Sequence, residues 1–66
     1  MIAVRDRVEL VHTDDPFTRL RPGSMGTVME VIRNPVGPGL VYEISWDSGS
    51  HLSMIEADGD RIQKVR

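Results

Sequence analysis

Apolar and polar residues alternate along several short stretches of the chain. Between residues 40 and 47, every second side chain is apolar: Leu40, Tyr42, Ile44 and Trp46. Successive side chains of a strand point to opposite faces, so this period of two predicts a strand with one buried face. Together with β-favouring composition, the same pattern predicts five strands, over residues 7–12, 26–33, 40–47, 51–55 and 61–65.

The second of these stretches departs from strict alternation. Val28 and Val31 are three positions apart, and Val31 is followed directly by Ile32. A strand that keeps both valines on the inner face needs an extra residue, which is a β-bulge. A helix is disfavoured because glycine, threonine, valine and isoleucine are poor helix formers. We therefore expect a bent strand.

Turn-forming residues separate the expected strands. A long loop opens at residues 14–16 and closes at residues 22–23, and the proline- and glycine-rich segment 34–39 excludes regular structure. Gly49 is expected to adopt a left-handed backbone in a tight hairpin turn. Residues 56–60 suffice for one helical turn, capped by Glu56 or Asp58. This order predicts an all-β fold, a small five-stranded SH3-like barrel with one short helical turn before the last strand.

Length and composition suit one small domain. The chain has 66 residues and no cysteine, so residues 1–66 are treated as a single domain without disulfides. No apolar stretch reaches the roughly 20 residues of a membrane span, and the first seven residues lack the apolar core of a signal peptide. A cytoplasmic protein with no membrane partner is expected.

The charge balance disfavours general nucleic-acid binding. Eight basic and ten acidic residues give a formal net charge of −2 and an isoelectric point near 5.5. Proteins that bind nucleic acid without sequence preference present a concentrated positive field to the phosphates. Only a local group of arginines would provide such a field here.

The order of motifs resembles a family of short uncharacterised bacterial proteins. The motifs are Asp6–Val11, Asp14–Phe17, Pro22–Val28 and Trp46–Ser50. That family is a domain of unknown function often carried on plasmids, phages and integrated elements of Gram-positive bacteria. The resemblance spans residues 4–65 and implies an SH3-like fold with no settled activity. It suggests an accessory protein of a mobile genetic element.

A second resemblance covers about half of the chain. Arg5–Val8, then Pro16–Phe17, then Gly23, Gly26 and Val28 are similar to the KOW motif of transcription elongation factors and ribosomal proteins. In those domains a glycine lets the first two strands pack tightly beside an RNA or protein surface. This resemblance implies a nucleic-acid-binding module. Its phosphate contacts would come from Arg5, Arg7, Arg19 and Arg21.

The sequence contains no catalytic motif. Serine and histidine residues are present, but no nucleophile elbow or equivalent motif places them. Two histidines without cysteine make a poor zinc site. Glu56, Asp58 and Asp60 lack the spaced ligand series of a calcium loop. We expect no enzyme activity, no metal and no cofactor.

The aromatic and arginine residues are the candidates for binding. Phe17 in the first loop either plugs the end of the barrel or projects as an anchor. Trp46 is either a core residue or half exposed near the turn. Arg19 and Arg21 flank Leu20, and they either grip an acidic or phosphate group or form a solvated face. In the second case Asp14, Asp15 and Asp60 balance them, and Leu20 belongs to the core.

The leading hypothesis is a non-enzymatic module that binds an unidentified protein partner through the first loop and the exposed barrel edge. The expected partner-binding residues are Asp14, Asp15, Phe17, Arg19, Arg21 and Trp46. The KOW-like nucleic-acid binder is the alternative. A homodimer formed through an open edge or an apolar end of the barrel is a third hypothesis.

Overall fold

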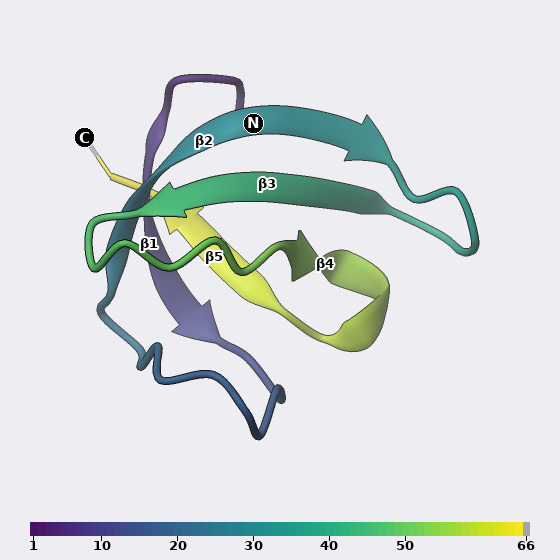
Figure 1. The fold of residues 1–66 in the computed structure, drawn as a ribbon. Coiled ribbons are helices and arrows are strands. Elements are labelled where there is room, and N and C mark those ends of the chain that lie inside the picture. The colour runs from purple at the N-terminus through teal and green to yellow at the C-terminus, as the bar shows by residue number, and fades with distance from the viewer. Residues whose placement is uncertain (66) are drawn as a thin grey trace.

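A computed structural model describes residues 1–65 as one five-stranded antiparallel sheet (Figure 1). The elements, in chain order, are β1 (Arg7–His12), β2 (Met25–Arg33), β3 (Leu40–Trp46), β4 (Met54–Ile55), the 3-10 turn η1 (Glu56–Asp58) and β5 (Arg61–Lys64). The strands are ordered β4-β3-β2-β1-β5 across the sheet. The predicted all-β fold, with five strands and a helical turn before the last, is confirmed.

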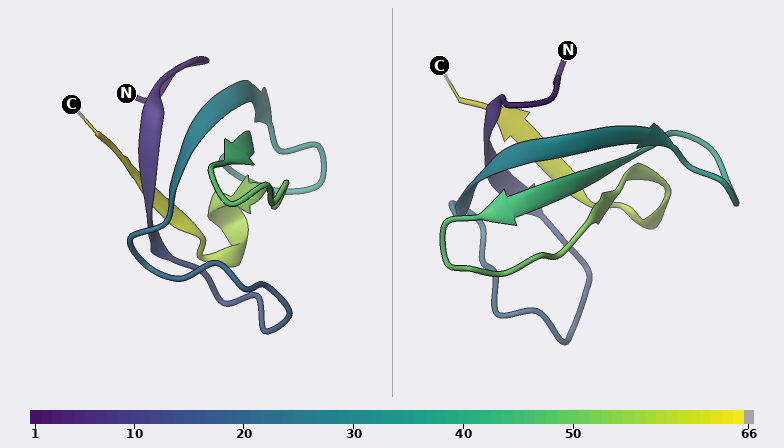
Figure 2. Two further views of the ribbon diagram at one scale, coloured as in Figure 1. Left: turned by 60° about the vertical axis from the view of Figure 1, so that its left-hand side comes forward. Right: turned by 45° about the horizontal axis from the view of Figure 1, so that its top comes forward.

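The sheet is strongly curved, with β1 and β5 crossing behind β2 and β3 (Figures 1 and 2). The hydrogen-bonded ladders run from β4 to β5 through the three middle strands. Residues of β4 and β5 lie close together, although no ladder joins these two strands within residues 1–65. The two edges of the sheet therefore approach each other across the core.

The bend in β2 comes from the predicted bulge. Val28 pairs with Ile44 and Glu30 with Glu43, so Met29 is an extra residue between them. Val28 is fully buried, whereas Met29 is 58% exposed. The bulge returns Val31 to the inner face, where it packs against the core. One strand can thus pair with β1 at its start and with β3 along its length.

The core lies on the concave side of the sheet and comes from all parts of the chain. Its members are Val8, Leu10, Leu20, Val28, Tyr42, Ile44, Trp46 and Met54. Val41 is also buried, although it lies on the face of β3 that the alternation predicts to be polar. The reason is its position between two neighbours, since it pairs with Ile32 of β2 and Ile55 of β4.

β4 is shorter than predicted. Residues 51–53 form no ladder, and two of their polar groups bond to other parts of the chain. The Leu52 carbonyl accepts a hydrogen bond from the Trp46 indole N–H at 2.9 Å, and the Ser53 hydroxyl donates to Glu43 at 2.7 Å. A side chain of the core therefore holds this segment, where the sequence pattern suggested a strand.

The helical turn η1 is capped differently from the prediction. It begins after Ile55 without a side-chain cap, so neither Glu56 nor Asp58 caps it. The Glu56 carboxylate instead accepts the Leu40 N–H at 2.6 Å and connects η1 to β3. Gly59 ends the turn with a φ of 90°, a left-handed conformation that glycine adopts without steric cost.

Gly26 allows β2 and β3 to approach closely. A methyl group at this position would lie 2.7 Å from Ile44 Cγ2 and 3.0 Å from both the Ser45 carbonyl oxygen and Trp46 Cε3. These distances are shorter than van der Waals contact, and two of the three atoms belong to buried core side chains. The absence of a side chain at Gly26 is therefore a packing requirement of the core.

We expect Gly26→Ala to lower the free energy of unfolding by about 1–3 kcal/mol, the usual cost of overpacking a core. Urea denaturation followed by Trp46 fluorescence measures the change. Gly37→Ala is the matched control, because Gly37 lies in an exposed loop where the new methyl would meet only the Asn34 side chain, at 3.3 Å. Equal stability of the two variants would contradict the packing requirement.

Candidate protein-interaction site

The first loop connects β1 to β2 and projects from one end of the sheet (Figure 1). Its base is closed by two backbone hydrogen bonds, from Leu10 N–H to the Ser24 carbonyl and from Gly23 N–H to the Leu10 carbonyl, both 2.8 Å. Leu20 enters the core from the loop, as one of the two sequence interpretations expects. Leu20 therefore anchors the loop to the body of the domain.

Short polar side chains order the tip of this loop. The Asp15 carboxylate accepts the Phe17 N–H at 2.9 Å, and the Thr18 hydroxyl accepts the Leu20 N–H at 3.1 Å. Aspartate and threonine commonly form such turns, because their side chains reach the backbone two residues ahead. The Thr13 hydroxyl also donates to Asp60 at 2.8 Å, which joins the loop to the segment between η1 and β5.

Phe17 projects from this ordered tip into solvent. Phe17 is 92% exposed, so it does not plug the end of the fold. Two hollows flank it, one of about 520 Å³ and the other of about 400 Å³. Both are lined by Asp15, Phe17 and Leu52. The exposed aromatic ring thus stands between two concave surfaces.

The two hollows differ in their charged residues. Arg19, Ser48 and Ser50 line the larger hollow together with the shared residues. The smaller hollow contains Asp14, Asp58 and Asp60. Sequence reasoning did not include Leu52 or Asp58 in the site. The apolar alternation at Leu52 indicates a strand, and the composition around Asp58 indicates a turn. Neither signal indicates which residues lie opposite in the fold.

Trp46 is a core residue. It is 2% exposed, and its indole N–H is used in the hydrogen bond to Leu52. The structure therefore places Trp46 in the core, the first of its two sequence interpretations, and leaves it almost no surface for contact with a partner. Trp46 still affects the site, because it holds the backbone of Leu52, which lines both hollows.

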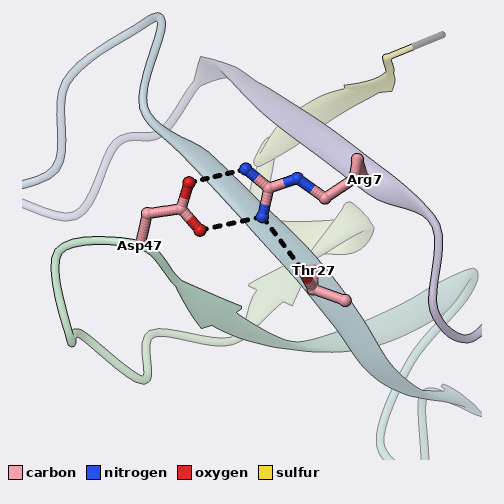
Figure 3. A network of polar contacts seen from close by, with 3 residues as sticks. All are labelled: Arg7, Thr27 and Asp47. Atoms are coloured by element: carbon pink, nitrogen blue, oxygen red, sulfur yellow. Dashed lines mark hydrogen bonds and ion pairs between the residues drawn. The ribbon is translucent and has the colours of Figure 1, made fainter.

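Arg7 is paired within the protein (Figure 3). Its guanidinium donates two hydrogen bonds to the Asp47 carboxylate, at 2.8 and 2.5 Å, and one to the Thr27 hydroxyl at 3.0 Å. These bonds raise the pKa of Arg7 and lower the pKa of Asp47. The pair links β1 to the turn after β3 across β2. Arg7 would therefore have to share or give up these bonds to contact a phosphate, although its side chain is 43% exposed.

The other candidate arginines lie in two places, Arg19 and Arg21 in the first loop and Arg5 just before the start of β1. Arg19 and Arg21 are exposed, as is Arg5, whose backbone N–H bonds to the Val28 carbonyl at 2.7 Å. The acids expected to balance the arginines have other partners. Asp14 contacts His12 at 2.8 Å, Asp15 accepts the Phe17 N–H, and Asp60 accepts from Thr13 and from Ile55 N–H.

Within residues 1–65, which the structure describes, no three histidine, cysteine, aspartate or glutamate side chains are grouped so that they could hold a metal ion. Nor does any helix there have the length and apolar character needed to cross a membrane.

The fold and the loop define a small all-β domain that carries an exposed aromatic residue on an ordered loop. The chain belongs to the family described as Domain of unknown function (DUF4314), which it matches over residues 5–65. The expected resemblance to a domain of unknown function over most of the chain is thereby confirmed. No match was found among curated proteins or among solved structures.

The Arg7–Asp47 pair is expected to make the stability of the protein depend on pH. The pKa of Asp47 is lower in the folded state than its ordinary value because Arg7 donates hydrogen bonds to the carboxylate. Such a group contributes stability that is present above its unfolded-state pKa, about 4, and is lost as the pH falls through its folded-state pKa. We therefore expect Asp47→Asn to reduce the loss of stability that follows acidification below about pH 5.

Urea midpoints measured at a series of pH values test this expectation. Arg7→Gln should have the same effect, because removal of either partner breaks the same bonds. The double variant should add little to either single one, since contacting residues are not additive. Variants that keep the full wild-type pH dependence would show that the pair does not contribute.

Proposed function

We propose that this protein is a small non-enzymatic protein-interaction module whose anchor is Phe17. The observation that carries the proposal is the 92% exposure of Phe17 on a loop tied down by Leu20, Thr13 and Asp15. A scattered exposed apolar residue is ordinary. A phenylalanine beside two hollows on an ordered loop has the form of an interface anchor.

The energetics support this role for the loop. Burial of a phenylalanine side chain against a partner contributes about 1.5–3 kcal/mol. A loop that is already ordered loses less conformational freedom when it binds than a mobile one. The hydrogen bonds from Phe17 and Leu20 to side chains two residues earlier therefore favour binding by ordering the loop in advance.

We propose that the curved sheet forms an SH3-like barrel. The bulge at Met29 and the approach of β4 to β5 support this architecture, since small barrels bend long strands so that one strand serves both halves. A cytoplasmic accessory role in a mobile genetic element rests on the resemblance to the bacterial family. The genes that neighbour this one would test it.

The nucleic-acid alternative receives less support. All four of its arginines, Arg5, Arg7, Arg19 and Arg21, are exposed, but Arg7 is paired with Asp47 and the chain has a net charge of −2. This alternative requires binding to RNA or DNA that weakens steeply with salt. A homodimer would show as concentration-dependent sedimentation. Both measurements separate these hypotheses from binding of a different protein.

Phe17→Ala tests the proposal directly. We expect the variant to lose the partner that the wild-type protein captures from an extract of its source cells. Its free energy of unfolding should change by less than about 0.5 kcal/mol, as is usual for surface substitutions. Quantitative mass spectrometry of the captured proteins and urea denaturation measure the two effects.

Val36→Ala is the matched control. Val36 is 93% exposed, on the loop between β2 and β3, and it lines neither hollow. This variant should retain the partner. Equal capture by all three proteins would overturn the role of Phe17, and a large loss of stability in Phe17→Ala would make Phe17 a structural residue.

A further inference from the structure

The smaller hollow beside Phe17 is a groove between the first loop and the segment that contains β4 and η1. Its volume is about 400 Å³. Four apolar or aromatic residues contribute to its lining: Pro16, Phe17, Leu52 and Ile55. We call this hollow the acidic groove, because its remaining residues are four aspartates and one serine. The aspartates are Asp14, Asp15, Asp58 and Asp60.

Every charged residue that lines the acidic groove is negative. The whole chain carries eight basic and ten acidic residues, and four of the acidic ones line this groove. The rest of the chain therefore carries eight basic and six acidic residues, a small positive excess. The net negative charge of the protein is thus concentrated beside Phe17.

The carboxylates are positioned but mostly not neutralised. Asp60 accepts hydrogen bonds from the Thr13 hydroxyl and the Ile55 N–H, and Asp15 accepts the Phe17 N–H. Neutral donors such as these orient a carboxylate and leave its charge in place. Within residues 1–65, the ion pairs include one acid of the groove, Asp14, and its partner is His12.

We infer that the acidic groove binds a basic, extended segment of a partner protein, with lysine or arginine residues beside apolar ones. This inference rests on the proposed interaction function and specifies the chemistry of the partner. Positive side chains complement the four aspartates. The aliphatic stems of lysine and arginine can cover Pro16 and Phe17 while their charged ends reach the carboxylates, and a cation over the Phe17 ring gains further attraction.

The charge pattern also orients the bound segment. Arg19 lines the hollow on the other side of Phe17, and it would repel a basic residue there. The basic residues of the partner should therefore lie on the side of Asp58 and Asp60. The segment continues past Phe17 with polar or acidic residues towards Arg19, Ser48 and Ser50.

Peptide titration followed by NMR tests this inference on the intact protein. Three short peptides of equal length serve as probes, and in each of them valine and leucine alternate with a second kind of residue. This second residue is lysine or arginine in the basic peptide, glutamine in the second peptide and glutamate in the third. We expect saturable shifts at the amides of Phe17, Leu52 and Asp58 with the basic peptide alone. The affinity should fall as salt shortens the screening length, which is about 10 Å at 0.1 M and about 3 Å at 1 M.

A pair of variants that change the net charge equally provides the control. Asp58→Asn removes an exposed carboxylate from the acidic groove and should weaken binding of the basic peptide about twofold to fivefold, as for exposed ion pairs. Glu30→Gln removes an exposed carboxylate from β2, outside the groove, and should leave the affinity unchanged. Comparison of the two separates a local contact from a general effect of charge.

Several results would overturn the inference. Failure of the basic peptide to bind, shifts located away from the groove, or equal weakening by the two variants would each do so. Equal binding of the glutamine or glutamate peptide at Phe17 would also overturn the basic specificity, while leaving Phe17 as an interaction anchor. Binding of RNA with shifts centred on Arg19 and Arg21 would instead identify the partner as nucleic acid and not as a protein segment. The proposed function fails separately, if partner capture does not depend on Phe17.

Discussion

The packing of Trp46 over Gly26 connects the core of this protein to its candidate site. Because Gly26 has no side chain, β2 and β3 approach closely beside the indole ring. The buried indole donates its N–H to the Leu52 carbonyl and so holds the backbone just before β4. Leu52 is partly exposed and contributes to both hollows beside Phe17. The surface at the loop thus depends on a contact in the core.

The acidic residues around Phe17 combine a structural and an electrostatic role. Asp15 orders the tip of the loop, and Asp60 joins the loop to β4 through Thr13 and Ile55. These bonds hold the carboxylates in place without supplying positive charge. A small domain of 66 residues can therefore present a shaped, charged surface without a large core, since the same side chains stabilise the loop and define its electrostatic character.

The candidate site could be predicted only in part. The first loop and Phe17 were identifiable from the proline, glycine and aspartate residues around them, but the sequence allowed Phe17 to be either buried or exposed. Trp46 was similarly ambiguous, because alternation places it on the inner face while the nearby turn suggests partial exposure. Arg7 belongs to the predicted arginine group, yet its bonds to Asp47 and Thr27 depend on how three segments come together.

The sequence by itself determined the all-β fold, the approximate strands, the bulge in β2 and the left-handed turn at Gly49, where φ is 92°. These features follow from local rules: side-chain alternation, the spacing of Val28 and Val31, and the conformational freedom of glycine. Only the tertiary structure decided which residues surround Phe17. The acidic groove joins the first loop to residues more than thirty positions later, and no local pattern specifies which segments meet across a curved sheet.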